Sequence, residues 1–209
     1  MTPRVTEEQY FDTHEKILRA AVVLFSHNGY NGTSMNDIVK ESGVSKGAIY
    51  SHFENKESLY LELQEQQTAI NIDQLKSLFA PEDSAMQKLE KVIQIQFNNT
   101  CAVPEENCRM EMEFLVTASR MDKLRAKIKD NFEVVHQFGV DIINEGVKKG
   151  EIRQDIDVDS VVSIFLAAMN GLSFLWLATG VPFDLEKVKN TFLTILFKGI
   201  LTASRDIDS

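Results

Sequence analysis

The sequence predicts an all-α fold of about nine helices. Apolar side chains recur at helical spacing in nearly every segment of the 209 residues, and no stretch shows the strict alternation typical of a half-buried strand. Only 10 glycines and 4 prolines interrupt the chain. With 44% hydrophobic and 25% charged residues, the composition is that of a globular protein with one large core or two modest ones.

The first three helices are expected over residues 7–28, 33–42 and 46–52. One apolar stripe runs along the first of them, formed by Ile17, Leu18, Ala21, Leu24 and Phe25. Glycine follows the first two helices, as Gly29 and Gly43, and suits the left-handed conformation that ends many helices. Ser45 and Asn55 are placed to cap the helices that follow them.

Six longer helices complete the prediction, over residues 56–79, 82–100, 105–119, 122–149, 158–178 and 184–204. Pro81 and Pro104 separate the earlier ones, because proline cannot continue a helix. Residues 161–178 are apolar on almost every face, yet the run is shorter than the roughly 20 residues of a membrane span. It also contains Asn170 and Gly171, so we expect a buried helix and no membrane association.

Composition and motifs exclude several classes of function. Residues 1–12 have no apolar core of a secretory signal, so we expect a cytoplasmic protein whose Cys101 and Cys108 are reduced. The four histidines are scattered without metal-ligand spacing, and phosphate-binding loops and nucleophile motifs are absent from the sequence. We therefore expect no metal, no cofactor and no enzymatic activity. Glu111 and Glu113, two apart on a helix, diverge and are expected to be solvated.

Charge alone does not favour a nucleic-acid partner. The net charge is −9, and residues 1–60 carry six Lys and Arg against eight Asp and Glu. DNA binding must therefore depend on where particular groups lie, with marked dependence on salt.

Residues 33–59 nevertheless have the pattern of a helix-turn-helix. Two short helices are joined by Ser42-Gly43-Val44-Ser45, a turn of the expected length with a glycine. A seven-residue helix is not stable alone in water, so its inner face, Ile49 and Phe53, must pack on the rest of the domain. The outer face is left for a partner, and it carries Lys46, Gly47, Tyr50 and Ser51.

This outer face suits DNA. Lys46 can donate to guanine or to phosphate, Gly47 permits close approach of the backbone, and Tyr50, Ser51 and His52 offer hydrogen bonds. The helix starts at Ser34 and Lys56 present free N–H groups that suit phosphate oxygens.

The run from Ile17 to Leu63 resembles the N-terminal domain of the tetracycline-repressor (TetR) family. The resemblance covers Phe25…Gly29-Tyr30, Thr33-Ser34, Ile38-Val39, Gly43-Val44-Ser45-Lys46-Gly47, and Tyr50-x-His52-Phe53-x-x-Lys56-x-x-Leu59. It implies that Lys46 and Gly47 read bases, and that a second set holds phosphates, namely Thr33, Ser45, Tyr50, His52 and Lys56. Ser51 stands where the family often has a larger aromatic residue. The expected DNA-binding residues are Thr33, Ser34, Ser45, Lys46, Gly47, Tyr50, Ser51, His52 and Lys56.

The resemblance also implies a plan for the body. Residues 1–55 would form the DNA-binding domain and 56–209 an effector-binding and dimerisation domain, with residues 158–204 pairing two subunits. The candidate ligand-binding residues are Phe97, Cys101, Met112, Phe114, His136, Phe138, Asn170 and Trp176.

The function expected is a homodimeric repressor released from double-stranded operator DNA by a small molecule. The clusters in residues 60–178 are aromatic and rich in Met and Leu, with few cations, so the effector is expected to be mostly apolar and neutral or cationic. One alternative is a DNA-binding regulator switched by a partner protein or by oxidation of Cys101 or Cys108. A helical enzyme or pure interaction module is a third.

Overall fold

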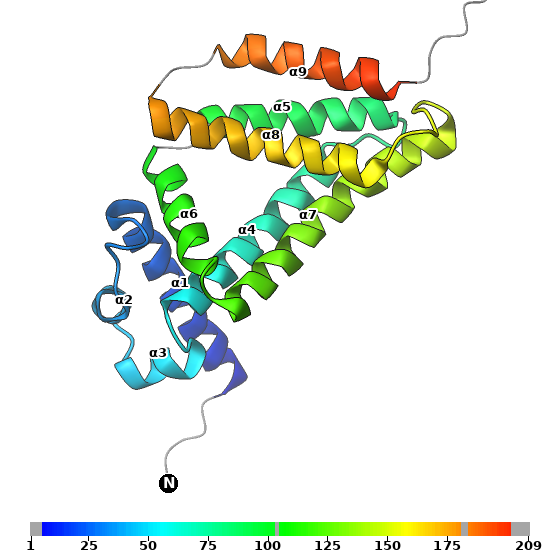
Figure 1. Ribbon diagram of the computed structural model, residues 1–209. Helices are drawn as coiled ribbons and strands as arrows, with labels where there is room; N and C mark the ends of the chain where they lie inside the picture. The colour runs from blue at the N-terminus through cyan, green and yellow to red at the C-terminus, as the bar shows by residue number, and fades with distance from the viewer. Residues whose placement is uncertain (1–5, 103–104, 181–183, 202–209) are drawn as a thin grey trace, which may run out of the picture. The chain divides into compact units, whose positions relative to one another are not determined.

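The structure is a computed structural model that describes residues 6–102, 105–180 and 184–201 (Figure 1). The predicted all-α fold is confirmed, with nine helices in these residues. They are α1 (Glu7–Asn28), α2 (Met35–Ser42), α3 (Lys46–His52), α4 (Lys56–Ser77), α5 (Ala85–Ala102), α6 (Glu105–Ala118), α7 (Asp122–Lys149), α8 (Val158–Thr179) and α9 (Leu185–Ile200).

The helices belong to two compact units. The first unit comprises residues 1–68 and 104–131, and the second comprises 69–103 and 132–209. The chain therefore passes between the units three times, within α4, between α5 and α6, and within α7. These units differ from the domains expected from the sequence, which divide between residues 55 and 56. The first unit also contains the start of α4, all of α6 and the start of α7.

Local capping fixes the helices of the first unit. Ser34 begins α2 with a reciprocal capping box, in which its Oγ accepts from Asp37 N–H and the Asp37 carboxylate accepts from Ser34 N–H. Gly43 then ends α2 in the left-handed conformation, with φ +66°. Gly29 also has a positive φ after α1, and its N–H donates to the carbonyl of Phe25.

One apolar core holds the first unit together. Its fully buried members come from every helix of the unit, and include Ile17 of α1, Ile38 of α2, Ile49 of α3, Leu59 of α4 and Phe114 of α6. The predicted stripe of the first helix lies in this core or against it. Burial of these side chains stabilises the unit by about 1.5–3 kcal/mol each, which the short helices could not supply alone.

The second unit contains two further clusters. In Figure 1, α5, α8 and α9 run side by side. The larger cluster joins Ala85, Ile142 and Ile152 to their neighbours, and the smaller one is formed by Ile93, Phe97 and Met169. A single β-bridge, Ile152 to Leu201, ties the loop after α7 to the end of α9 within the described residues.

The expectation that the α8 segment is buried was wrong for the single chain. Only 12% of the most apolar 18-residue window of α8 is buried, and Ile164 and Phe174 are 66% and 52% exposed. By length and composition, α8 is the one helix in the described part of the chain that could cross a membrane. Periodicity could not show the exposure, because an apolar face that packs on a partner has the same composition as one that packs inside.

Candidate DNA interface and effector site

The recognition helix α3 has the two faces that the sequence predicts. Ile49 is fully buried and Phe53, which follows the helix, is 3% exposed. Lys46, Gly47 and Tyr50 are exposed, and a Cβ on Gly47 would meet no atom within 4 Å. The exposed side of α3 is thus open to a partner, with no side chain of the described residues covering Gly47.

The serines and the threonine of the predicted set are engaged within the unit. Ser34 and Ser45 cap α2 and α3, and the Ser51 hydroxyl donates to the carbonyl of Ala48 at 2.6 Å. Thr33 is only 2% exposed, and its hydroxyl lies 2.9 Å from the carbonyl of Gly29. The Thr33 side chain, expected at phosphate, therefore lies in the interior, where its hydroxyl holds the end of α1.

Lys56 also has partners inside the unit. Its ammonium group donates to the carbonyl oxygens of Tyr30 at 2.7 Å and Thr33 at 2.9 Å, and lies over the Tyr30 ring at 4.1 Å. Partial burial lowers its pKa, while the carboxylates of Glu57 and Glu113 act in the opposite direction. An ammonium group has three donors, so two carbonyls leave one for a phosphate oxygen.

His52 lies in a cluster that the sequence did not predict. Its Nδ1 is 3.3 Å from Nδ1 of His14, and the other nitrogen of His14 is 2.5 Å from Glu62 Oε1. The Tyr10 ring stacks on the His52 ring with centroids 4.1 Å apart. Burial lowers the pKa of His52, and the neighbouring His14 lowers it further.

Helix α6 supplies residues that sequence reasoning missed. Glu113, expected to be solvated, is half-buried, and its carboxylate accepts from the backbone N–H of Asn31 at 3.1 Å. The ring of Phe114 packs against Tyr30 and Tyr60, with centroids 5.3 and 4.3 Å apart. These contacts join α6 to the turn between α1 and α2. The only sequence signal was a carboxylate beside an apolar residue, which does not identify a partner 82 positions away.

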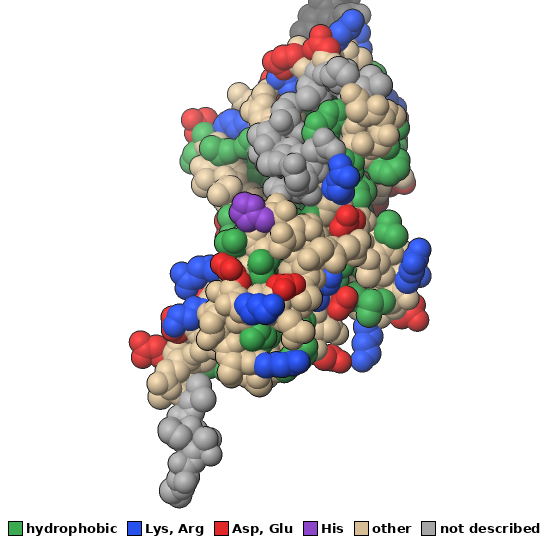
Figure 2. Space-filling model, turned by 90° about the vertical axis from the view of Figure 1, so that its left-hand side faces the viewer, with side chains coloured by type: hydrophobic (Ala, Val, Ile, Leu, Met, Phe, Trp, Pro, Cys, Tyr) green, Lys and Arg blue, Asp and Glu red, His purple; other side chains and the backbone are tan. Residues whose placement is uncertain are grey.

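The face drawn in Figure 2 carries no continuous basic patch among its described residues. Figure 2 shows Lys and Arg side chains interspersed with Asp and Glu over the described part of the face that it displays. Binding to DNA would therefore rest on individual contacts around α3 rather than on the overall field.

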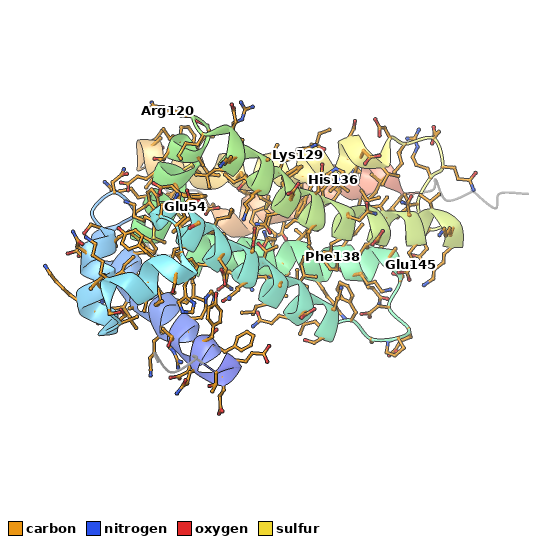
Figure 3. The ribbon with its side chains drawn as sticks, turned by 90° about the horizontal axis from the view of Figure 1, so that it is seen from below. Glu54, Arg120, Lys129, His136, Phe138 and Glu145 are labelled. Carbon is orange, nitrogen blue, oxygen red and sulfur yellow. The ribbon has the colours of Figure 1, made fainter. Side chains whose placement is uncertain are left out.

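The predicted ligand residues of the second unit differ in exposure. Phe97 is buried in the smaller cluster, at 6.2 Å from the ring of Phe192. On α7, Figure 3 labels His136, whose Nε2 lies 3.2 Å from the carbonyl of Asp159, and Phe138, which stacks on Phe79. Trp176 is half-buried. Asn170 is exposed, and its amide donates to the carbonyl of Leu166.

The other predicted ligand residues belong to the first unit or are not described. Met112 is half-buried on α6, whereas Phe114 belongs to the core that also contains Ile49 of α3. The side chain of Cys101 lies outside the described residues. Cys108 is buried, at 7% exposure.

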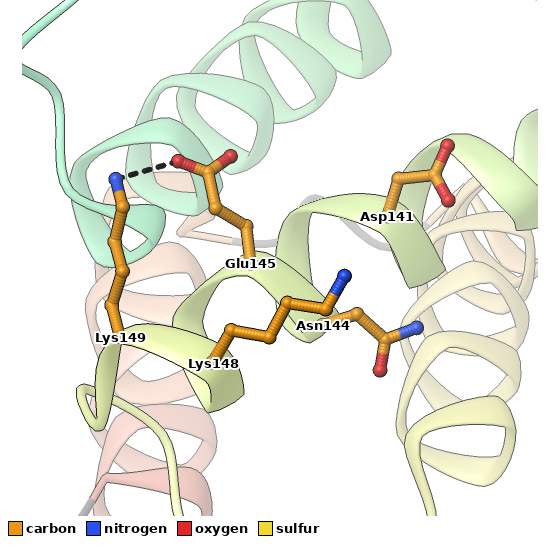
Figure 4. A pocket seen from close by; sticks show the side chains of 5 residues that line it. All are labelled: Asp141, Asn144, Glu145, Lys148 and Lys149. Carbon is orange, nitrogen blue, oxygen red and sulfur yellow. Dashed lines mark hydrogen bonds and ion pairs between the residues drawn. The ribbon is translucent and has the colours of Figure 1, made fainter.

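A pocket of about 490 Å³ lies on α7 and has a different character (Figure 4). Its lining residues are Asp141, Asn144, Glu145, Lys148 and Lys149. None of the predicted ligand residues lines it, and all five lining residues are polar or charged. Among the described residues, no group of three His, Cys, Asp or Glu is arranged to hold a metal ion.

An all-helical chain with an exposed, glycine-containing recognition helix after a left-handed turn defines a helix-turn-helix DNA-binding regulator. A family model described as bacterial regulatory proteins, tetR family, matches residues 17–63, and a tetracyclin repressor-like C-terminal domain matches residues 116–192. The chain belongs to the tetR family of bacterial regulatory proteins. It is a transcriptional regulator and not an enzyme.

Relatives match along nearly the whole chain. A fatty acid metabolism regulator protein of Bacillus subtilis is 26% identical over 88% of this chain and 94% of its own length. The HTH-type transcriptional repressor KstR2 of Mycolicibacterium smegmatis is 27% identical over 96% and 97%. The solved structure of the regulator FadR from Bacillus subtilis in complex with stearoyl-CoA has a TM-score of 0.69 at 24% identity, covering 90% and 99% of the two chains. This last likeness shows a shared fold.

Proposed function

We propose that the protein is a cytoplasmic, homodimeric repressor that reads operator DNA with the exposed face of α3 and is released by a mostly apolar small molecule. The observation that carries the proposal is the exposure of Lys46, Gly47 and Tyr50 on a helix whose other face is fully buried. A helix held in this way offers its side chains to base edges in the major groove. Lys46 and Gly47 are proposed to contact bases, and Ser34, Ser45, Tyr50 and Lys56 phosphates.

The exposed apolar face of α8 and α9 supports the dimer. Ile164 and Ile195 are 66% and 67% exposed, and Phe174 and Leu175 about half exposed. An exposed surface of this kind costs free energy in water, and a second copy of the same face would cover it with twofold symmetry. The two reading helices would then enter successive major grooves, about 34–36 Å apart or a multiple of that distance.

The charges of the second unit support an effector that is not an anion. Lys88 and Lys149 pair with Glu145, and Lys91 pairs with Asp83 at 2.6 Å. Lys189, which is only 7% exposed, pairs with Glu186 and donates to Gln94. Because these cations already have partners, an anionic group buried beside them would have to displace a carboxylate. Half-buried aromatic and aliphatic residues around Phe97 suit an apolar ligand.

Within the first unit, α6 and α4 are both connected to the turn between α1 and α2. Glu113 and Phe114 of α6 hold Asn31 and Tyr30, and Tyr30 in turn holds the start of α4 through Lys56. A ligand that moves α6 would therefore also move the turn between α1 and α2, which precedes the helix-turn-helix. Helices α4 and α7 each continue from one compact unit into the other, which supports the same coupling.

Calorimetric titration of the free and operator-bound protein tests the proposed switch. Three probes with the same apolar chain, stearylamine, stearyl alcohol and stearoyl-CoA, separate the chain from the charge of the head group. We expect the amine or the alcohol to bind, and its affinity to fall in the presence of operator by the factor by which it weakens operator binding. Equal affinities with and without operator would exclude the switch, and binding of stearoyl-CoA alone would overturn the proposed charge of the effector.

The burial of Cys108 disfavours its oxidation as the switch. A redox-sensing thiol is exposed beside cations, whereas Cys108 is buried. If peroxide and reductant both leave operator binding unchanged, the result supports the small-molecule switch.

A further inference from the structure

A hydrogen bond between two histidines, His14 and His52, lies at the end of the recognition helix α3. His52 is the last residue of α3, and His14 lies on α1, which contributes to the same apolar core as α3. The Nδ1 atoms of the two rings are 3.3 Å apart. A hydrogen bond between two nitrogens requires that one carries a proton and the other does not.

Glu62 fixes the state of the first ring. Its carboxylate Oε1 lies 2.5 Å from His14 Nε2, so this nitrogen carries the proton that is donated. His14 Nδ1 can then accept from His52 or donate to it, but both arrangements hold a single proton between the two rings. If both Nδ1 atoms are protonated, two N–H groups face each other and the link is lost.

Ring stacking holds the same two side chains in place. His52 stacks on Tyr10 at 4.1 Å and His14 on Phe53 at 4.8 Å. The titratable groups that face His52 in the described structure are Tyr10 and His14 from α1 and Glu62 from α4. Of these three groups, Glu62 is the one whose charge favours a positive charge on His52, and its carboxylate already accepts a hydrogen bond from His14.

We propose that His14 and Glu62 are positioning residues for DNA reading, which act through His52 to hold the end of α3, and that acidification breaks this link and lowers the preference for operator over random DNA. The proposal rests on the proposed role of α3 in reading bases. Burial and the neighbouring His14 lower the pKa of His52 from its ordinary value of 6.5, so protonation of His52 is resisted in the folded protein. One proton added to either ring still leaves a donor facing an acceptor, so the link is complete above that value and is lost only in more acidic solution, when both Nδ1 atoms carry a proton.

The test compares operator and random duplexes by fluorescence anisotropy from about pH 8 to about pH 5.5, in the range where histidine titrates. The operator is the duplex that the protein itself selects from a random library. We expect the ratio of operator affinity to random-DNA affinity to fall by about 2- to 10-fold on acidification. This factor corresponds to the net contribution of one hydrogen bond. His14→Phe keeps a ring for stacking but has no nitrogen, and should reduce the ratio at high pH and abolish its pH dependence.

His27→Gln is the matched control, because His27 is exposed at the end of α1. It should keep the wild-type profile. The proposal is overturned if His14→Phe shows the same fall as the wild type, or if the ratio is constant. A ratio that rises on acidification also overturns it.

Hydrogen exchange of the free wild-type protein provides a test that needs neither a variant nor DNA. The protection of the Ile49 and Phe53 amides, which close α3, should fall on acidification relative to that of Ile38 in α2. Unchanged relative protection overturns the proposal. If no duplex is selected from the library, the proposed function fails, and the exchange result still decides whether the histidine link holds α3.

Discussion

The ammonium group of Lys56 lies 4.1 Å from the centre of the Tyr30 ring and donates to the Tyr30 carbonyl oxygen at 2.7 Å. The Tyr30 hydroxyl donates to Glu57, the next residue along the chain from Lys56, at 3.0 Å. The start of α4 is thus attached to the turn between α1 and α2 from two sides. Burial, and next the charge of Glu57, raise the pKa of the Tyr30 hydroxyl, so it remains a donor.

Lys56→Ala should destabilise the protein by about 1–3 kcal/mol, because it leaves two partly buried carbonyls without their charged donor. Urea unfolding measures this loss. The same variant should weaken binding to operator and random DNA alike and reduce the salt slope by about one unit if the third ammonium donor reaches a phosphate. An unchanged salt slope would restrict Lys56 to its structural role.

Lys46→Ala should relax base preference without a loss of stability, since the Lys46 side chain is exposed. The cost on the preferred site is expected to be about 1–3 kcal/mol if Lys46 makes a bidentate contact with guanine. Lys40→Ala removes the same charge from the exposed surface of α2 and is the control. If both variants lose affinity equally on operator and random DNA, Lys46 acts through charge alone.

Ile164→Arg should separate the dimer and sharply reduce operator affinity, because it places a charge in the exposed apolar face of α8. Ala168 on the same helix is not suited to this test, because it packs against the smaller cluster of its own chain. Val22→Arg, at a residue 52% exposed on α1, is the matched control. Sedimentation velocity should find the control dimeric. If the Ile164→Arg variant is still a dimer, the interface lies on another surface of the protein.

Asp83→Asn should lower the melting temperature at neutral pH, because the Asp83 carboxylate accepts from Lys91 and from the N–H of Ala80. The bond with Lys91, and then that with Ala80, hold the pKa of Asp83 below its ordinary value of 3.8. Its contribution is therefore complete above that value and is lost as the pH falls through the lowered pKa. The difference between wild type and variant should shrink in acid, whereas the exposed Asp73→Asn control should show little difference at any pH.

Much of the fold could be predicted because its signals are local. Gly29, Gly43, Ser34 and Ser45 each end or begin a helix through contacts with residues at most four positions away. The helix boundaries accordingly agree with the predicted ones within a few residues, except that the prediction extended the last helix to 204, beyond the described residues. The two faces of α3 follow from the same short-range periodicity.

The partners of the site residues could not be predicted in the same way. His14 meets Glu62 across 48 positions, and Glu113 meets Asn31 across 82. A sequence shows that a side chain can donate or accept, but a long-range partner is decided by how the helices pack. The exposure of α8 could not be predicted for a related reason, because an apolar composition does not show whether a helix packs inside its own chain or lies at its surface.

Selection of duplexes from a random DNA library by the purified protein, followed by sequencing, tests the proposed function. We expect one enriched near-palindrome, with half-sites one helical turn apart, about 10–10.5 base pairs, or a multiple of it. Each half-site should lose its base preference at one position with Lys46→Ala. Enrichment of no sequence, or of a single asymmetric site bound by one subunit, would contradict it.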